Sequence, residues 1–235
     1  MNGTEPSLKE IQSLATMHPN ASIDILICPP ATLLSRAAGI AGPIALGGQD
    51  CHANEKGAHT GDVSAAMLLD AGATYVIVGH SERRTDHGEN DAAVQAKARA
   101  AIGAGLTAII CVGETLEERE RGDTLNVVGS QIAGSVPADL GGNKIVVAYE
   151  PVWAIGTGKV PTLDEIGEVH GFIRKQLVSI GLSGASDVPL LYGGSVKPSN
   201  AAEIFGVADV DGALVGGASL LADDFSGIVA ALEAI

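Results

Sequence analysis

The sequence predicts a parallel α/β fold, because short apolar runs alternate with amphipathic helical segments along its 235 residues. The apolar runs are nearly continuous, as expected of strands buried on both faces; they span residues 23–28, 44–48, 75–79, 108–112, 145–149, 190–193 and 213–216. No linker-like segment interrupts the alternation, so residues 1–235 are expected to form a single domain.

The segments between these runs carry helical signals. A helix over residues 7–15 precedes the first strand, and Thr162 with Glu165 forms a capping box before another helix. Gly72 and Gly105 fall where helices would end. Two apolar faces recur at helical spacing: Val94, Ala98, Ala101 and Ile102, then Ile166, Val169, Ile173, Leu177 and Ile180. A barrel of this kind closes with about eight strands, so the first strand is expected to be missing.

Composition narrows the function classes. A net charge of −14 argues against nucleic acid and anionic membrane surfaces as partners. The cysteines (Cys28, Cys51 and Cys111) are odd in number and form no C-x-x-C, which favours a reducing, cytoplasmic location. No secretion leader opens the sequence and no apolar run reaches about 18 residues, so neither export nor membrane spanning is expected. The histidines lack H-E-x-x-H spacing, so no metal site is predicted.

Glu150 is the strongest catalytic candidate. It ends an apolar strand and is followed at once by residues 151–159, which carry Trp153, Ile155 and two glycines. Catalytic groups of such folds lie at the carboxyl ends of strands, and this segment is typical of a lid. A plain turn would explain the Pro and Gly residues without chemistry but leaves Trp153 and Ile155 unexplained. We interpret Glu150 as a general base that the lid shields from water.

His80 lies at the end of another predicted strand. It stands between a glycine and a Ser-Glu pair that could cap a helix. A helix N-terminus would lower the pKa of the imidazole, and the neutral ring could then donate a hydrogen bond to a substrate oxygen. A lone histidine there would more often be structural. Paired with a carboxylate at the same end of the sheet, it is better interpreted as an acid/base partner.

Two glycine pairs follow the last two predicted strands. Gly193-Gly194, followed by Ser195, and Gly216-Gly217 would let backbone N–H groups approach an anion, and a helix starting at the second pair would add its dipole. Each pair alone could simply serve a tight turn. Together they match the usual phosphate site of this architecture.

These motifs together resemble the triosephosphate isomerase family over the whole sequence, from Met1-Asn2-Gly3-Thr4 onward. The specific matches are Gly79-His80-Ser81-Glu82-Arg83-Arg84, the segment from Ala148 to Lys159, Tyr192-Gly193-Gly194-Ser195 and Leu214-Val215-Gly216-Gly217-Ala218-Ser219. The resemblance implies a (β/α)8 TIM barrel that interconverts dihydroxyacetone phosphate and D-glyceraldehyde 3-phosphate through an enediolate, in glycolysis and gluconeogenesis. It also implies that the reaction needs no metal or organic cofactor.

The resemblance assigns roles residue by residue. Glu150 would be the base, and His80 would polarise the carbonyl. The phosphate would be held by Gly156, Ser195, Gly216 and Gly217, and the supporting residues would be Glu82, Cys111 and Tyr192, with Glu82 pairing a cation. Residues 49–60 resemble the family's projecting loop, which inserts into a partner subunit, so a homodimer is implied.

Two departures from the family pattern stand out. The family begins with a strand ending in Asn-Trp-Lys-Met-Asn-Gly, whose lysine and first asparagine contact the substrate, whereas this sequence starts at Met1-Asn2-Gly3. Our hypothesis is that this start is artificial; the alternative is a non-catalytic, phosphate-binding remnant. An aldolase would want a Schiff-base lysine, which none of the predicted strand ends supplies. The second departure is Pro161, which has no N–H for the family tyrosine matching Tyr192 to bind.

Overall fold

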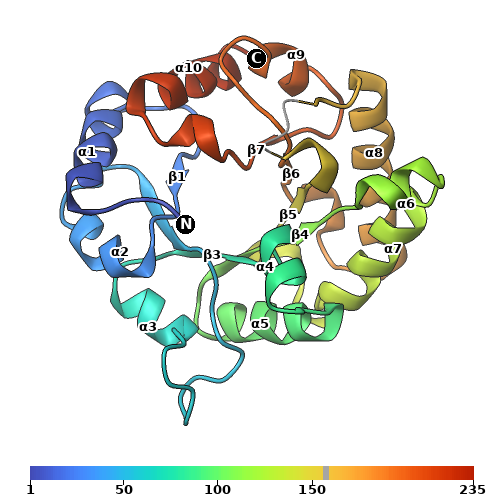
Figure 1. The fold of residues 1–235 in the computed structure, drawn as a ribbon, viewed down its shortest axis with the longest axis horizontal. Coiled ribbons are helices and arrows are strands. Elements are labelled where there is room, and N and C mark those ends of the chain that lie inside the picture. Colours follow the sequence, from blue (N-terminus) through green and yellow to red (C-terminus); the bar gives the residue numbers. More distant parts are fainter. Residues whose placement is uncertain (156–158) are drawn as a thin grey trace.

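Seven parallel strands form a single curled sheet with a ring of helices outside it (Figure 1). This computed structural model describes residues 1–155 and 159–235. The strands lie side by side in chain order: β1 (Leu26–Ile27), β2 (Ala45–Gly48), β3 (Tyr75–Val78), β4 (Thr107–Val112), β5 (Ile145–Tyr149), β6 (Leu190–Tyr192) and β7 (Gly212–Ala213). The parallel α/β prediction is confirmed, in the form of a TIM-barrel-like fold. Every strand therefore directs its carboxyl end to the same rim.

The helices occupy the connections between strands. They are α1 (Leu8–Met17), α2 (Ala31–Ala38), α3 (Ala65–Asp70), α4 (Ser81–Asp86), α5 (Asp91–Gly103), α6 (Leu116–Glu120), α7 (Thr124–Ser135), α8 (Leu163–Ser179), α9 (Ala201–Phe205) and α10 (Ala222–Glu233). Short 3-10 turns include η4 (Val152–Ala154) and η6 (Gly217–Ser219). The predicted capping box is confirmed at the start of α8, where Thr162 and Glu165 bond reciprocally. None of the helices in the described ranges is long and apolar enough to cross a membrane.

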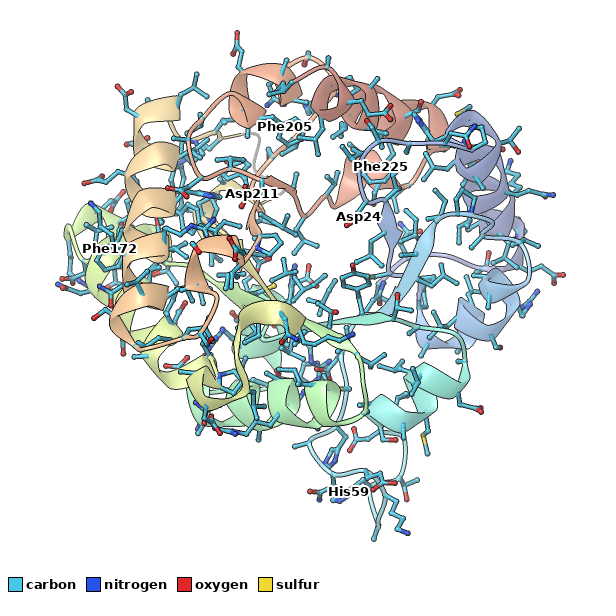
Figure 2. The ribbon with its side chains drawn as sticks, turned by 180° about the vertical axis from the view of Figure 1, so that it is seen from behind. Asp24, His59, Phe172, Phe205, Asp211 and Phe225 are labelled. Carbon is cyan, nitrogen blue, oxygen red and sulfur yellow. The ribbon has the colours of Figure 1, made fainter. Side chains whose placement is uncertain are left out.

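A loop between β2 and α3 projects beyond the ring of helices, with His59 near its tip (Figures 1 and 2). Its base is fixed by charge, because Asp50 accepts from Lys97 at 2.7 Å and pairs with Arg83 at 3.0 Å. His52 forms an isolated bridge with Ser64, which closes the loop on itself. The loop predicted at residues 49–60 is thus a protruding element with an anchored base.

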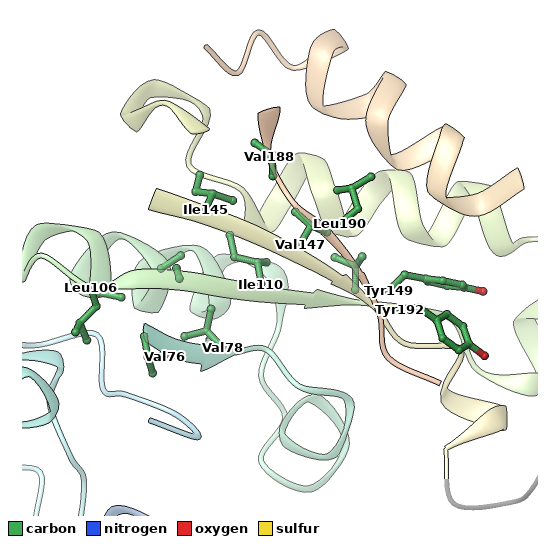
Figure 3. Close-up of a cluster of buried hydrophobic side chains, with 14 of the residues drawn as sticks. Val76, Val78, Leu106, Ile110, Ile145, Val147, Tyr149, Val188, Leu190 and Tyr192 are labelled. Carbon is green, nitrogen blue, oxygen red and sulfur yellow. The ribbon is translucent and has the colours of Figure 1, made fainter. Parts of the chain in front are cut away.

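Alternate residues of the strands serve two apolar clusters. The outward-facing side chains, such as Val78, Ile110 and Val147, pack beneath the helices (Figure 3). The inward-facing side chains point into the middle of the curled sheet; the buried ones are Ile77, Ile109, Cys111, Val146 and Ala148. A strand has a side-chain period of two, so strands with both faces covered need apolar residues at every position. This explains why the strand sequences are continuously apolar.

The sheet has two free edges, at β1 and β7. The strand order ends at these two elements, and within the described residues they do not pair with each other. The strands predicted at residues 23–28 and 213–216 are wrong in length, since only Leu26–Ile27 and Gly212–Ala213 form ladders. Each has a neighbour on one side only, so fewer backbone hydrogen bonds hold it extended. A cavity of about 1940 Å³ opens here and reaches the rim that carries Glu150.

Candidate active site

Glu150 and His80 meet at the carboxyl rim of the sheet. Glu150 directly follows β5, and His80 lies between β3 and α4. His80 Nε2 is 2.8 Å from Glu150 Oε1, although the Glu150 side chain is only 2% exposed. The backbone N–H of Ser81 donates to Glu150 Oε2 at 3.0 Å, and the Ser81 hydroxyl lies 3.5 Å from Oε1. The structure therefore brings together the two residues that the sequence singled out, with Ser81 as a partner that it did not.

The hydrogen bonds of His80 define its tautomer. Its Nδ1 accepts from the backbone N–H of Glu82 at 3.3 Å, as an N-cap of α4. An imidazole nitrogen that accepts carries no proton, so the proton of the neutral ring lies on Nε2 and points at Glu150. The predicted helix start is confirmed here, and it fixes the orientation of the ring.

The pKa of His80 differs from the expectation. Burial lowers it, but the hydrogen bond and charge of Glu150 outweigh burial, so the pKa of His80 is raised above its ordinary value. The expectation that the helix N-terminus would lower it is wrong for this arrangement, because a carboxylate at 2.8 Å is the closer charge. Because folding raises the pKa of His80, its pairing with Glu150 stabilises the folded state fully below about pH 6.5. That stabilisation is lost as the pH rises through the raised pKa of His80.

The ends of β4 and β6 pack against Glu150 on the sides away from the cavity. Burial, followed by the charge of Glu150, raises the pKa of the Cys111 thiol well above its usual range, so the thiol stays protonated. A Cβ at Gly113 would lie 1.7 Å from the Glu150 carbonyl oxygen, and one at Gly193 would lie 2.9 Å from Glu150 Cγ. Cys111 is therefore a close neighbour of the carboxylate. Gly113, which was not among the predicted site residues, lets β4 approach the end of β5.

A second buried carboxylate, Glu114, lies behind the start of the lid segment. One oxygen, Oε1, accepts from Tyr149 Oη at 3.1 Å and Trp153 Nε1 at 3.0 Å, and lies 3.5 Å from Arg119 Nη1. Val152 N–H also donates to the Glu114 carbonyl. Glu114 was not among the predicted site residues. The available signal was a charged residue two positions after β4, a strand that is buried at all but its first residue.

The two glycine pairs have different surroundings. Gly216 and Gly217 are not buried and a Cβ at either would meet nothing within 4 Å, whereas a Cβ at Gly194 would lie 2.1 Å from Tyr192 Oη. Packing thus requires Gly194, and the open pair leaves room for a ligand. The helix expected at Gly216-Gly217 is only the 3-10 turn η6, with α10 beginning at Ala222, so the predicted contribution of a helix dipole is wrong.

The other predicted site residues are also placed by the structure. Ser195 donates its hydroxyl to the Ala154 carbonyl at 2.9 Å, which links β6 to the lid segment. Tyr192 is fully buried, and no hydrogen-bond partner for its hydroxyl lies in the described part of the chain. Gly156 lies outside the described residues. His80, Glu150, Ser195 and both glycine pairs line the same cavity.

Comparison with known proteins agrees with this arrangement. The family profile described as Triosephosphate isomerase matches residues 1–232. The chain belongs to this family. Among curated relatives, the triosephosphate isomerase of Ruegeria sp. (strain TM1040) is 66% identical over 234 residues, which cover all of this chain and 95% of the relative. That of Rhizobium meliloti (strain 1021) is 55% identical over 238 residues, covering 99% and 93%.

A solved structure shows the same fold. The crystal structure of triosephosphate isomerase from Bartonella henselae superposes with a TM-score of 0.91 at 51% identity, over 98% of this chain and 94% of that one. The family resemblance inferred from the motifs is thereby confirmed.

Glu82 has an exposed carboxylate at the rim of the cavity. Its side chain is 70% exposed, and its carboxylate lies 4.0 Å from His80 Nδ1. No ion pair with a lysine or arginine is found for it within residues 1–155 and 159–235, so the expected cation partner stays a prediction.

One group of side chains in the projecting loop has the composition of a metal site. The candidate ligand atoms of His52, His59 and Asp62 lie within 4.8 Å of one another. His52 Nδ1 accepts the N–H of Asn54 at 2.9 Å, which leaves the ring proton on Nε2, the nitrogen that faces Asp62. Metal-binding histidines normally donate from the second nitrogen instead. This group is therefore a poor ligand set, and the absence of a metal stays a prediction.

We predict that Glu150→Gln lowers the pKa of His80 below its ordinary value of about 6.5, because burial then acts without the carboxylate that opposes it. An NMR titration of the imidazole measures this. Glu82→Gln is the matched control and should shift the pKa less, since the Glu82 carboxylate is exposed and 4.0 Å away. An equal shift in the two variants would contradict the assignment to Glu150.

Proposed function

We propose that this protein interconverts dihydroxyacetone phosphate and D-glyceraldehyde 3-phosphate, with Glu150 as the base and His80 as the electrophilic partner. The observation that carries the proposal is the buried Glu150 carboxylate, 2.8 Å from a nitrogen of His80, on the wall of a cavity that open glycines also line. Membership of the triosephosphate isomerase family supports the reaction as a whole.

The chemistry moves one proton between two carbons and another between two oxygens. Glu150 removes a proton from the carbon beside the carbonyl, and the electron pair moves onto the carbonyl oxygen to give an enediolate. His80, protonated on Nε2, donates a hydrogen bond to that oxygen and stabilises the developing charge. His80 also moves the proton of the neighbouring hydroxyl to that oxygen, and Glu150 returns its proton to the former carbonyl carbon, so that the carbonyl and the hydroxyl change places. Triosephosphate isomerase is itself a standard example of this division of roles between a glutamate base and a neutral histidine.

The substrate phosphate would be held by backbone N–H groups. We propose Gly216 and Gly217, which are accessible and unobstructed, together with Ser195 and with Gly156, which lies outside the described residues. Binding an anion to a protein of net charge −14 requires donors directed at it locally, and accessible glycine N–H groups can supply them. The Ser195 hydroxyl, bound here to the Ala154 carbonyl, would leave that acceptor and donate to the phosphate.

We further propose that residues 1–235 form one barrel domain and that an additional strand lies between β1 and β7 in the working enzyme. The two free edges and the cavity between them support this. A lysine at the end of that strand, as in the family, would reach the exposed Glu82 carboxylate and attract the phosphate. The second candidate function is phosphate binding with weak or no catalysis, in a protein without that lysine. The open edge between β1 and β7 favours this alternative.

A homodimer is part of the proposal. The loop between β2 and α3 projects from the ring, and its base is anchored by Asp50, Lys97 and Arg83 (Figure 1). A protrusion with a rigid base suits insertion into a second copy. Sedimentation equilibrium of the native protein tests the dimer, and a monomer mass would count against it.

We also propose that the enzyme is located in the cytoplasm, on the basis of its three free cysteines.

Glu150→Gln is expected to lower kcat for triose phosphate isomerisation by about 10³-fold, because the amide cannot accept the proton. Glu168→Gln, the same change on the exposed face of α8, should leave kcat unchanged. A coupled assay in each direction measures both. Wild-type turnover that is absent, or that survives Glu150→Gln within tenfold, would refute the proposed mechanism.

The additional strand can be tested by supplying it. Extending the chain by a strand ending in Asn-Trp-Lys should raise both its kcat and its free energy of unfolding, because two free edges become paired. Kinetics and chemical unfolding of the two forms measure this. Equal kcat and equal unfolding free energy would rule the proposal out.

Tyr192→Phe is expected to change turnover by less than about threefold. Pro161 has no N–H for the Tyr192 hydroxyl to bind when the lid closes, and the hydroxyl is buried without a partner in the described residues. Removing an unpaired buried hydroxyl is nearly neutral for stability. Kinetics and thermal unfolding of the variant check both statements, and a large loss of kcat would show that the hydroxyl has a catalytic contact.

A further inference from the structure

Asn200 stands at the N-cap position of α9, but its side chain does not cap that helix. The helix begins at Ala201, and an asparagine at this position normally accepts a hydrogen bond from an N–H of the first turn. The Asn200 side chain makes no such bond. It turns back to the loop of residues 195–200, where both its oxygen and its nitrogen are hydrogen-bonded. The side chain therefore holds the loop and not the start of the helix.

The amide of Asn200 brackets the loop that follows β6. Its Oδ1 accepts the backbone N–H of Lys197 at 2.8 Å, and its Nδ2 donates to the carbonyl oxygen of Ser195 at 3.1 Å. The backbone N–H of Asn200 donates to the Lys197 carbonyl at 3.1 Å. A short polar side chain that bonds to backbone groups three and five residues earlier favours one loop conformation. The bond to the carbonyl orients the peptide unit that joins Ser195 to Val196.

Two apolar contacts hold the rest of this loop. Val196 is 4% exposed and belongs to the main core cluster. Pro198 packs so closely on α10 that a Cβ at Gly227 would lie 3.0 Å from it. A glycine inside a helix costs stability relative to alanine, and the approach of Pro198 explains its presence here. The partner found for the Ser195 carbonyl among the described residues is the Asn200 amide.

Asn200 lies behind the site. Ser195 and Lys197 line the cavity that also contains Glu150, whereas Asn200 is not among the described residues that line it. The Asn200 amide is therefore placed to orient Ser195 without reaching a ligand in the cavity itself.

We propose that Asn200 is a positioning residue that fixes the Ser195 peptide, and with it the direction of the Ser195 hydroxyl, for binding the substrate phosphate. The inference rests on the proposed function, which gives Ser195 that role. A donor that is already oriented binds an anion more tightly than one that must be ordered on binding, because less conformational entropy is lost. Loss of the bracket should therefore weaken phosphate binding and raise KM, with less effect on kcat.

Asn90 offers a matched control. It occupies the same N-cap position before α5, but its Oδ1 accepts the N–H of Ala93 at 2.9 Å in the usual way. One substitution, asparagine to alanine, thus removes a helix cap at residue 90 and the loop bracket at residue 200. The experiment compares Asn200→Ala with Asn90→Ala by Tm, kcat, KM and the Kd of glycerol 3-phosphate. Ser195→Ala, alone and combined with Asn200→Ala, completes a double-mutant cycle.

Asn200→Ala should raise the Kd of glycerol 3-phosphate and KM about five- to tenfold, as expected for the loss of one well-placed hydrogen bond, with a smaller change in kcat. Asn90→Ala should leave Kd and KM unchanged and lower Tm by about 2–4 °C, because a helix cap is lost. Adding Asn200→Ala to Ser195→Ala should change Kd by less than about twofold, since Asn200 acts through Ser195. Wild-type Kd in Asn200→Ala, or effects that multiply in the double variant, would overturn the proposal.

A measurement without ligand separates this inference from the proposed function. The Ser195 carbonyl and the Val196 nitrogen share one peptide unit, so the amide-nitrogen resonance of Val196 reports the bond from Asn200. Asn200→Asp keeps an oxygen for the Lys197 N–H but removes the donor, and this resonance should therefore move. If the wild-type protein shows no isomerase activity, the proposed function fails, whereas the Kd of glycerol 3-phosphate and the Val196 resonance still decide whether Asn200 positions Ser195. An unmoved Val196 resonance would refute the positioning role at any level of activity.

Discussion

The ends of several strands are arranged around one contact, that of the buried Glu150 carboxylate with the imidazole of His80. The side chain is 2% exposed, and its neighbours come from the ends of other strands: His80 and Ser81 after β3, Cys111 and Gly113 at the end of β4, and Gly193 after β6. Only a parallel sheet directs all of these ends to one rim. The close approach of β4 and β6 leaves no room for a Cβ at the two glycines. The burial of Glu150 therefore follows from the same packing that builds the sheet.

Glu114 and Glu150 follow successive strands and are both buried, yet their surroundings give them different properties. Glu114 is held by tyrosine, tryptophan and arginine donors and does not line the cavity. Glu150 has a backbone N–H, a hydroxyl and an imidazole as partners, and it faces the cavity. Glu114 is thus enclosed by fixed donors, whereas Glu150 keeps one side open to the cavity. The surroundings make Glu114 part of the frame and leave Glu150 accessible to a ligand.

The opening between β1 and β7 affects the same site. It joins the interior of the sheet to the rim through the cavity of about 1940 Å³, and it lies on the side where Glu82 is exposed without a lysine or arginine partner among the described residues. Water in such an opening weakens every charge interaction near Glu150 and His80. Closing the edge would raise both the local electrostatic strength and the number of backbone hydrogen bonds. Stability and catalysis are therefore expected to rise together.

Local patterns in the sequence determined the seven strands, the capping box of Thr162 and Glu165, the two apolar helix faces and the candidates Glu150 and His80, because each depends on residues within a few positions. The tertiary structure decided the raised pKa of His80, the cluster at Glu114, the requirement for Gly113 and Gly194, and the shortened β1 and β7. The contact of Ser81 with Glu150 joins residues 69 positions apart, and that of Tyr149 with Glu114 spans 35. Charge, packing and strand length at these places depend on which distant residues the fold brings within a few ångströms, and no local pattern carries that information.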